Sequence, residues 1–327
     1  MKIIISFILL AVDFLAMALF KRYPAFFFPA YRHFSAALMN GLAKLSSNLS
    51  FTLWDLLLVG LLVYLLIYFL RQGFRKGLIQ SFFLVSLLGS FAILGWALNH
   101  YAPPLAQELG MVIREHSKEE LIEASEYYLK KAQYYSALVA RAEDGSLVVA
   151  DKVALAKAAG NVHYFSLLGD YLMYNGISGM FMPLTGEAGV PGNEPLPSLG
   201  FTMCHEAAHR QGIAAEQEAN FMAFLDCIGR DDAYFCYSGY FQAFRYCYNA
   251  LYKIDKEAAF DLLKRGDSTL LLRDMADEYQ VYKKYESPLQ DVSDKINDTY
   301  LKTFSQEEGS TSYGQVVDYL LAYYDGL

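Results

Sequence analysis

The amino-acid sequence predicts a mainly α-helical membrane protein, with three transmembrane helices in residues 1–100 and a mostly helical domain in residues 101–327. Hydrophobic residues make up 54% of the chain, which is too many for an ordinary soluble enzyme of this length. The charge is divided unevenly, because residues 1–100 carry a net charge of +6 and residues 101–327 a net charge of −14. A basic section in the lipid bilayer joined to an acidic globular section explains this division, which also argues against nucleic acid as a partner.

Three apolar runs are each close to the length that crosses the hydrocarbon core of a bilayer. They cover residues 3–20, 53–70 and 81–98. Asp13 interrupts the first run, and a carboxyl group in lipid has to face another helix or be protonated. The alternative for the first run is a secretory signal, although the run is long and no clear small-residue cleavage site follows it.

The basic residues between these runs predict the orientation in the membrane. Arg71, Arg75 and Lys76 crowd one very short connection, whereas four basic residues are spread over the longer connection before it. Basic residues favour the cytoplasmic side, so the short connection and the N-terminus are expected in the cytoplasm. The chain is then a multi-pass protein of the cell (inner) membrane, with everything after residue 98 extracytoplasmic.

The domain is expected to begin with two helices. Ser117 with Glu120 three residues later has the form of a capped helix start, and apolar residues then recur at helical spacing to about residue 142. Residues 151–174 predict a second helix. Its His163 is expected to be an ordinary core or surface histidine, because no other ligand type accompanies it at ligand spacing.

Glycine and proline are frequent over residues 176–200, directly before the strongest motif of the chain. Residues 177–184 within this stretch predict a short strand, with a plain surface loop as the alternative.

The strongest motif is His205-Glu206-x-x-His209. On a helix, two histidines four residues apart share one face and can bind one divalent metal ion, and the intervening glutamate can act on metal-bound water. The two alanines in the motif favour a helix, and Gly212 can end it because glycine accepts the left-handed conformation. The motif therefore predicts a zinc hydrolase in which Glu206 is the general base.

A second helix, starting at Glu216, can supply the third ligand that a catalytic zinc site needs. Glu216 and Asn220 share one face of this helix, while Glu218 points away from it. We therefore expect Glu216 to bind the metal and Asn220 to hydrogen-bond the free ring nitrogen of a metal-binding histidine. The alternative is that both glutamates are ordinary first-turn acids, stabilised by the helix dipole.

The chain after this region is expected to be helical almost to its end. The predicted helices cover residues 233–253, 255–265, 268–285, 292–304 and 316–324. Tyr313 lies in an expected turn between the last two, and a tyrosine hydroxyl can stabilise the oxyanion of a tetrahedral intermediate. Tyr313 is therefore a candidate catalytic residue, with packing in a core or turn as the alternative.

The four cysteines all lie in the second section, as Cys204, Cys227, Cys236 and Cys247. One or two disulfides on an oxidising face and buried free thiols are equally compatible with their number. Cys204 points away from the line that joins the two histidines of the motif, so we do not expect it to bind the metal.

At the motif the sequence resembles the gluzincin-type metallopeptidases, in which a His-Glu-x-x-His helix precedes a helix with Glu-x-x-Ala-Asp or Glu-x-x-Ala-Asn. The matching residues are His205, Glu206 and His209, then Glu216, Ala219 and Asn220. The resemblance implies a zincin-like fold, in which an edge strand just before the metal helix pairs with an extended peptide substrate.

A longer resemblance runs over nearly the whole chain. Residues 96–105, 176–188 and 312–314 are similar to a bacterial family known as a domain of unknown function, number 3810 in that series. This resemblance implies membrane helices ahead of a zincin-like domain, but no substrate. It also implies that Glu216 and Glu218 are both family features, which keeps Glu218 open as the alternative metal ligand.

These features together predict a membrane-anchored zinc metallopeptidase that acts on a peptide or protein substrate. Zn²⁺ would be bound by His205, His209 and Glu216, and Glu206 would move a proton from the attacking water to the leaving amine. The alternative is a non-catalytic sensor or binding protein that keeps the metal-binding fold. A di-iron helical bundle is disfavoured, because it needs a second Glu-x-x-His sequence.

Overall fold

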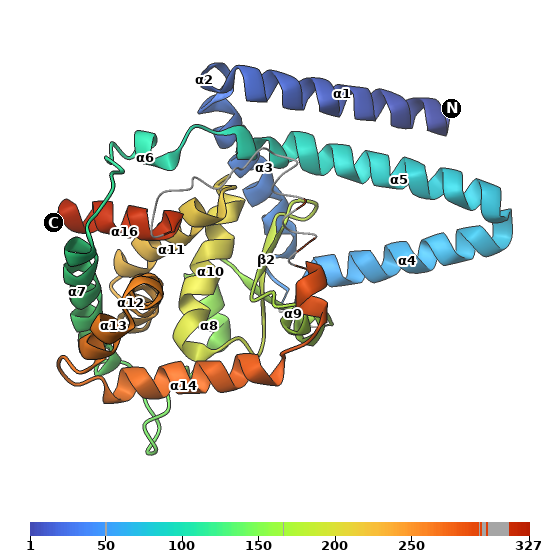
Figure 1. Ribbon diagram of the computed structural model, residues 1–327. Helices are drawn as coiled ribbons and strands as arrows, with labels where there is room; N and C mark the ends of the chain where they lie inside the picture. The colour runs from blue at the N-terminus through green and yellow to red at the C-terminus, as the bar shows by residue number, and fades with distance from the viewer. Residues whose placement is uncertain (50, 166, 294, 296–298, 300–313) are drawn as a thin grey trace.

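The computed structural model describes residues 1–49, 51–165, 167–293, 295, 299 and 314–327. Long apolar helices project from a mostly helical domain that contains one small sheet (Figure 1). The predicted mainly α fold, with three apolar helices ahead of a domain that has a small sheet, is thus confirmed.

Three helices of the described chain are long and apolar enough to span a membrane. They are α1 (Lys2–Arg22), α4 (Leu53–Gln72) and α5 (Phe74–Gly95). α1 lies along α5, while α4 and α5 form a hairpin at Gly73, whose φ of +79° suits glycine (Figure 1). The third helix begins directly after this glycine rather than at residue 81, so the predicted run was placed about two turns too late.

These membrane helices bury polar groups and expose apolar ones. Asp13 of α1 is buried, and its carboxylate accepts a hydrogen bond of 2.6 Å from the Ser90 hydroxyl of α5. Outward-facing side chains such as Phe14 and Leu70 are 70% and 78% exposed. This arrangement suits lipid, which covers the apolar surface while the polar groups bind helix to helix. The expectation that Asp13 faces another helix is confirmed.

Two helices that the sequence did not reveal follow α1. They are α2 (Pro24–Phe27) and α3 (Ala30–Ser46). α3 packs against the sheet of the domain, where the turn at Gly186 comes so close that a Cβ atom would lie 2.1 Å from the Met39 carbonyl oxygen. Part of the chain between the first two membrane helices therefore forms one wall of the domain.

The sheet has three strands in the order β1-β3-β2. They are β1 (His163–Phe165), β2 (Met180–Met182) and β3 (Glu187–Pro191). β1 runs parallel to β3, with Tyr164 opposite Val190, and β2 runs antiparallel to it, with Phe181 opposite Ala188. The strand predicted within residues 177–184 is therefore present as β2, and it lies at an edge of the sheet.

The predicted single helix over residues 151–174 is wrong. This stretch forms α8 (Lys152–Ala158), then β1, then α9 (Gly169–Tyr174). Gly160 and Asn161 have φ values of +100° and +59°, and two consecutive left-handed residues end a helix. His163 is buried in β1 with its Nε2 3.1 Å from the Ser46 carbonyl oxygen, so it is a core histidine as expected.

The remaining elements of the domain are helical, and the sequence predicted most of them. They are the 3₁₀ helix η1 (Ala97–Tyr101), α6 (Leu105–Glu108), α7 (Lys118–Ser136), α10 (Leu196–Arg210), α11 (Glu216–Ile228), α12 (Ala233–Ile254), α13 (Lys256–Leu263), α14 (Thr269–Lys284) and α16 (Gln315–Asp325). Ser117 and Glu120 form the predicted capping box of α7. The helix predicted over residues 292–304 falls largely outside the described residues, and Tyr313 lies outside them.

The hydrophobic core of the domain surrounds α12. This helix packs against α7, α10, α11 and α13, and its aromatic side chains Phe235, Tyr237, Phe241 and Phe244 are almost completely buried. The four cysteines lie buried as free thiols, so of the two open alternatives the structure has the one without disulfides.

Candidate metal centre

The candidate site lies where α10 ends and α11 begins. Gly212 follows the last turn of α10 with a φ of +85°, as predicted from its place after the motif. A Cβ atom there would come within 2.9 Å of the Arg32 side chain, so both the backbone and its neighbours require glycine. The tight turn brings Glu216, the first residue of α11, back to the histidines of α10.

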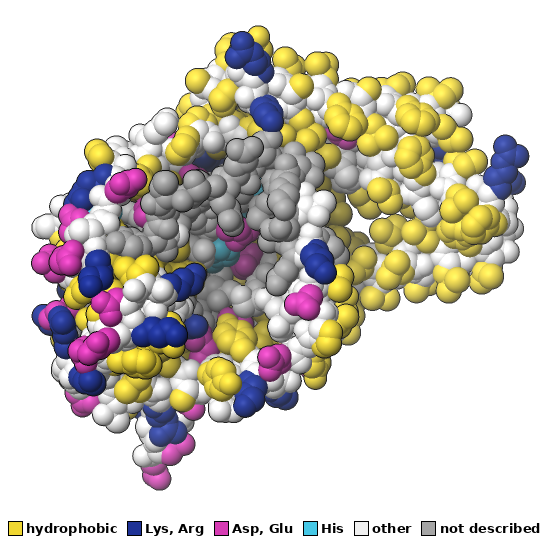
Figure 2. All heavy atoms as spheres, in the orientation of Figure 1, with side chains coloured by type: hydrophobic (Ala, Val, Ile, Leu, Met, Phe, Trp, Pro, Cys, Tyr) yellow, Lys and Arg dark blue, Asp and Glu magenta, His cyan; other side chains and the backbone are white. Residues whose placement is uncertain are grey.

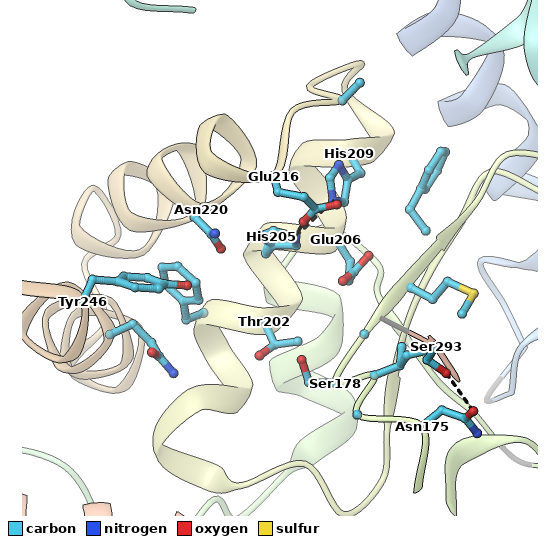
Figure 3. Close-up of a pocket in the computed structure, with 18 of the residues that line it drawn as sticks. Asn175, Ser178, Thr202, His205, Glu206, His209, Glu216, Asn220, Tyr246 and Ser293 are labelled. Atoms are coloured by element: carbon cyan, nitrogen blue, oxygen red, sulfur yellow. Dashed lines mark hydrogen bonds and ion pairs between the residues drawn. The ribbon is translucent and has the colours of Figure 1, made fainter. Parts of the chain in front are cut away.

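Three possible metal ligands converge at this turn (Figure 3). The Nε2 atoms of His205 and His209 are 3.0 Å apart, and carboxylate oxygens of Glu216 lie 3.3 Å and 3.7 Å from them. All three ligand atoms lie within 4.8 Å of one another. Ligand atoms about 2.0–2.1 Å from a tetrahedral zinc ion are roughly 3.3 Å apart, so the donor set and its spacing fit one zinc ion.

The chain also orients one of these imidazole rings. His209 Nδ1 lies 2.7 Å from the Ile213 carbonyl oxygen, and because a carbonyl only accepts, Nδ1 carries the proton. The lone pair on Nε2 is then directed at the site, as a metal ligand requires. The prediction that Asn220 hydrogen-bonds the free ring nitrogen of a metal-binding histidine is wrong. The Ile213 carbonyl accepts the hydrogen bond of His209 Nδ1, and His205 Nδ1 has no hydrogen-bond partner among the described residues.

The charges of the three groups support one another. Burial lowers the pKa of His209, but its contacts with the Glu216 carboxylate outweigh burial and raise the pKa to about 9. Burial raises the pKa of Glu216, but hydrogen bonds from both histidines outweigh it and hold the pKa far below its ordinary value. The cluster therefore favours a positive charge between the imidazoles and the carboxylate, which a proton or a divalent cation can supply.

Glu206 lies beside these ligands on α10, with 5% of its surface exposed. Burial raises the pKa of its carboxyl group, and the neighbouring His205 and His209 lower it in part. Gly179 next to β2 permits this placement, since a Cβ atom there would lie 2.5 Å from a Glu206 carboxylate oxygen. A carboxylate with a raised pKa, next to a metal-binding group, is suited to move protons.

Glu218 lies on a different face of α11 and is 7% exposed. Its carboxylate accepts hydrogen bonds from the Leu105 amide at 2.7 Å and the Tyr319 hydroxyl at 3.2 Å. These bonds tie α11 to the first turn of α6 and to α16. The geometry therefore favours Glu216 over Glu218 as a ligand.

A cavity of about 790 Å³ opens at the candidate site, and α10, α11, α12 and the segment around β2 form its walls (Figure 3). Sequence reasoning missed several polar residues of these walls. They are His100 from η1, and Gln242, Arg245 and Tyr246 from α12. The only sequence signal was the i, i+3, i+4 spacing on α12, which does not tell a cavity wall from a solvent-exposed face.

Two of these wall residues have shifted pKa values. Burial and the nearby His209 lower the pKa of His100 to about 4, so the ring is neutral at pH 7. Burial raises the pKa of Tyr246 to about 12, so the phenol keeps its proton. Tyr246 can therefore donate a hydrogen bond into the cavity at neutral pH, and the neutral ring of His100 keeps one N–H group.

The fold and the site define a membrane protein whose helical domain holds a group of two histidines and one glutamate that could bind a metal ion. The chain belongs to the family described as "Protein of unknown function (DUF3810)", whose model matches residues 31–321. This match confirms the longer of the two resemblances stated from the sequence. No curated protein and no solved structure showed significant similarity to the chain.

Proposed function

We propose that this protein is a membrane-anchored zinc metallopeptidase with a gluzincin-type core and a zincin-like fold. The observation that carries the proposal is the convergence of His205, His209 and Glu216 on one point, with the carboxylate of Glu206 beside it. Nothing else in the described chain offers three such ligands. We place the protein in the cell (inner) membrane with its domain extracytoplasmic, because of the basic residues in the connection between α4 and α5.

His205, His209 and Glu216 would hold the zinc ion, which would supply a Lewis acid and an acidified water. Glu206 accepts the proton of the attacking water on its carboxylate and delivers it to the nitrogen of the leaving amine. Among the described residues β2 is an edge strand, and its outer edge can pair with the substrate backbone and so hold an extended peptide across the cavity.

A donor to the developing oxyanion completes this mechanism. Tyr246 and His100 are the described candidates, since both line the cavity and keep an O–H or N–H group at pH 7. Tyr313 stays a candidate from the sequence alone. Replacing Tyr246 with Phe and His100 with Gln separately would identify the donor as the one whose loss lowers kcat and leaves KM unchanged.

The first test is the metal content of the full chain purified in detergent, for the wild type, His205→Ala and Glu216→Ala. We expect about one zinc per wild-type chain and almost none in either variant, because each loses one of three ligands. Glu218→Gln is the matched control and should keep its zinc. Folded wild-type protein that binds no zinc would overturn the proposal, and bound zinc without hydrolysis of any peptide would favour the sensor alternative.

A further inference from the structure

We propose that the substrates are polypeptides that are themselves anchored in the membrane, and that they are cut within a few residues of the bilayer surface. This inference rests on the proposed peptidase function and adds the class of substrate. Three features of the structure support it: the link between α5 and the metal helix, the position of the two tryptophans, and the polarity of the cavity from end to end.

The candidate site is attached directly to the end of a membrane helix. Trp96 follows Gly95, the last residue of α5, and its indole N–H donates a 2.7 Å hydrogen bond to the His209 carbonyl oxygen. The centres of the Trp96 and His209 rings are 6.1 Å apart. One aromatic side chain therefore spans the distance between the end of α5 and a candidate metal ligand.

The second tryptophan of the chain lies at the corresponding end of the neighbouring membrane helix. Trp54 is in the first turn of α4, and since α4 and α5 form a hairpin, both tryptophans mark the same boundary (Figure 1). Tryptophan prefers the interface between lipid and water, and Trp54 is partly exposed there, while Trp96 is buried between the end of α5 and the domain. The Glu187 carboxylate of β3 accepts hydrogen bonds from the Leu53 and Trp54 amides, at 2.7 Å and 2.9 Å, so the sheet is held at this boundary too.

The surface on this side of the domain is also apolar. Figure 2 shows mostly yellow side chains over the projecting helices and around α2, while most of the acidic side chains lie over the domain. Phe26 in α2 and Phe34 in α3 are 82% and 56% exposed. Aromatic side chains at the end of α1 would enter the same interface as the two tryptophans.

The cavity changes character along its length. Its end at α5 is aromatic, where Phe181 of β2 packs on Trp96 with ring centres 5.1 Å apart and His100 lies 5.6 Å from Trp96. Thr202 lies about 10 Å further along α10 from His209, at roughly 1.5 Å per residue, and Arg245 and Tyr282 line the same polar region. We therefore expect a substrate to lie with one end beside the bilayer and to extend toward the polar end.

The length of an extended chain limits where it is cut. β2 lines the cavity through Met180 and Phe181, and Phe181 contacts Trp96, so a strand paired with β2 would lie close to Trp96. At about 3.3 Å per residue, the 6.1 Å between the Trp96 and His209 rings corresponds to about two residues. Peptide bonds at this distance from a membrane anchor are the expected targets.

The test uses the full chain in proteoliposomes together with a substrate made of one membrane helix followed by a tail of identical short peptide repeats. Every repeat offers the same local sequence, so mass spectrometry of the products reports position alone. We expect most cuts in the repeat next to the anchor, and at least tenfold slower cleavage of the same tail without an anchor. Glu206→Gln in the same vesicles is the control for a contaminating peptidase.

The outcomes separate the two proposals. Equal cleavage in every repeat, or equal rates for anchored and free tails, would overturn the inference and leave the peptidase proposal intact. Zinc-loaded protein that cuts neither tail would overturn the peptidase proposal and this inference with it.

A second measurement depends on no hydrolysis. In Trp54→Phe protein the fluorescence comes from Trp96 alone, and lipids that carry a spin label at the headgroup should quench it more than lipids labelled at the chain end. Quenching by neither label would place the site away from the bilayer and overturn the inference, whatever the peptidase assay shows.

Discussion

Two groups of acidic side chains, one at the candidate metal centre and one behind the polar wall of the cavity, differ in how the protein satisfies them. In the group formed by Glu194 and Glu278, Glu278 accepts hydrogen bonds from Ser198 and Arg245, and one oxygen of Glu194 accepts bonds from the Tyr282 and Thr202 hydroxyls at 2.9 Å and 3.2 Å. At the candidate metal centre, two imidazole nitrogens and the half-exposed carboxylate of Glu216 face one another instead. A buried acid therefore does not by itself indicate a metal site, whereas several possible ligand atoms that face one point are the pattern expected of one.

The largest effect should come from the acid beside the metal centre. Replacing Glu206 with Gln removes the proton acceptor and keeps the shape, so peptide hydrolysis should fall by about 10²–10⁴-fold while zinc stays bound. Hydrolysis rates and metal analysis on the same preparation would check this. Loss of zinc along with activity would instead make Glu206 a metal ligand, like Glu216, rather than the proton acceptor.

The next effect concerns Glu218, whose carboxylate already has two hydrogen-bond donors within the protein. Replacing Glu218 with Ala removes two hydrogen bonds and leaves the buried Leu105 amide without its acceptor, which should cost about 1–3 kcal/mol of unfolding free energy. Zinc content should not change. Denaturant unfolding in detergent measures the unfolding free energy, and metal analysis measures the zinc content. Loss of zinc from folded Glu218→Ala protein would make Glu218 a candidate ligand again.

A further effect should appear as a pH dependence of stability. Burial raises the pKa of Glu194 from 4.5 to about 8. The folded state thus binds this proton more tightly than the unfolded state, and the unfolding free energy should decrease as the pH rises from about 4.5 to 8. Glu194→Gln keeps an acceptor for Tyr282 and removes the titration.

The measurement is thermal unfolding of the wild type and Glu194→Gln at pH 5 and pH 8. The variant should lose several degrees less in Tm between these two conditions than the wild type does. The same loss of Tm in both proteins would mean that Glu194 stays charged in the folded state. The two acidic groups would then differ less than their hydrogen bonds suggest.

The smallest effect should come from the link to the membrane helix. Trp96→Phe removes the hydrogen bond to the His209 carbonyl and keeps an aromatic ring, which should cost about 1 kcal/mol. Zinc affinity, measured by competition with a chelator, should fall about fivefold. No change would show that α11 and the turn at Gly212 hold the ligands without help from α5.

The parts of the molecule that the sequence revealed depend on local signals. The three apolar runs, the capping box at Ser117 and the spacing of His205 and His209 each need only a few neighbouring residues to be recognised. Gly212 is of the same kind, because its left-handed backbone is a property of the turn itself.

The missed parts depend on contacts between distant residues. β3 has the sequence Glu-Ala-Gly-Val-Pro, which is poor for a strand, and it forms because β1, β2, α9 and α10 cover it on all sides. Trp96 and Arg245 join the cavity only because α5 and α12 end there or pass it. The Gly160-Asn161 pair is a different case. These two residues are a local signal for the end of a helix, and the prediction of one helix over residues 151–174 overlooked it.

The hydrogen bonds between Glu187 and the first amides of α4 have a mechanical consequence. A helix in a bilayer that is too thin for it changes its tilt, and a rigid end connection transmits that rotation. Here the connection leads into β3, the central strand of the sheet. One neighbour of β3 is β2, the strand that borders the cavity. We therefore expect the position of β2, and with it the shape of the cavity, to depend on the thickness of the surrounding lipid.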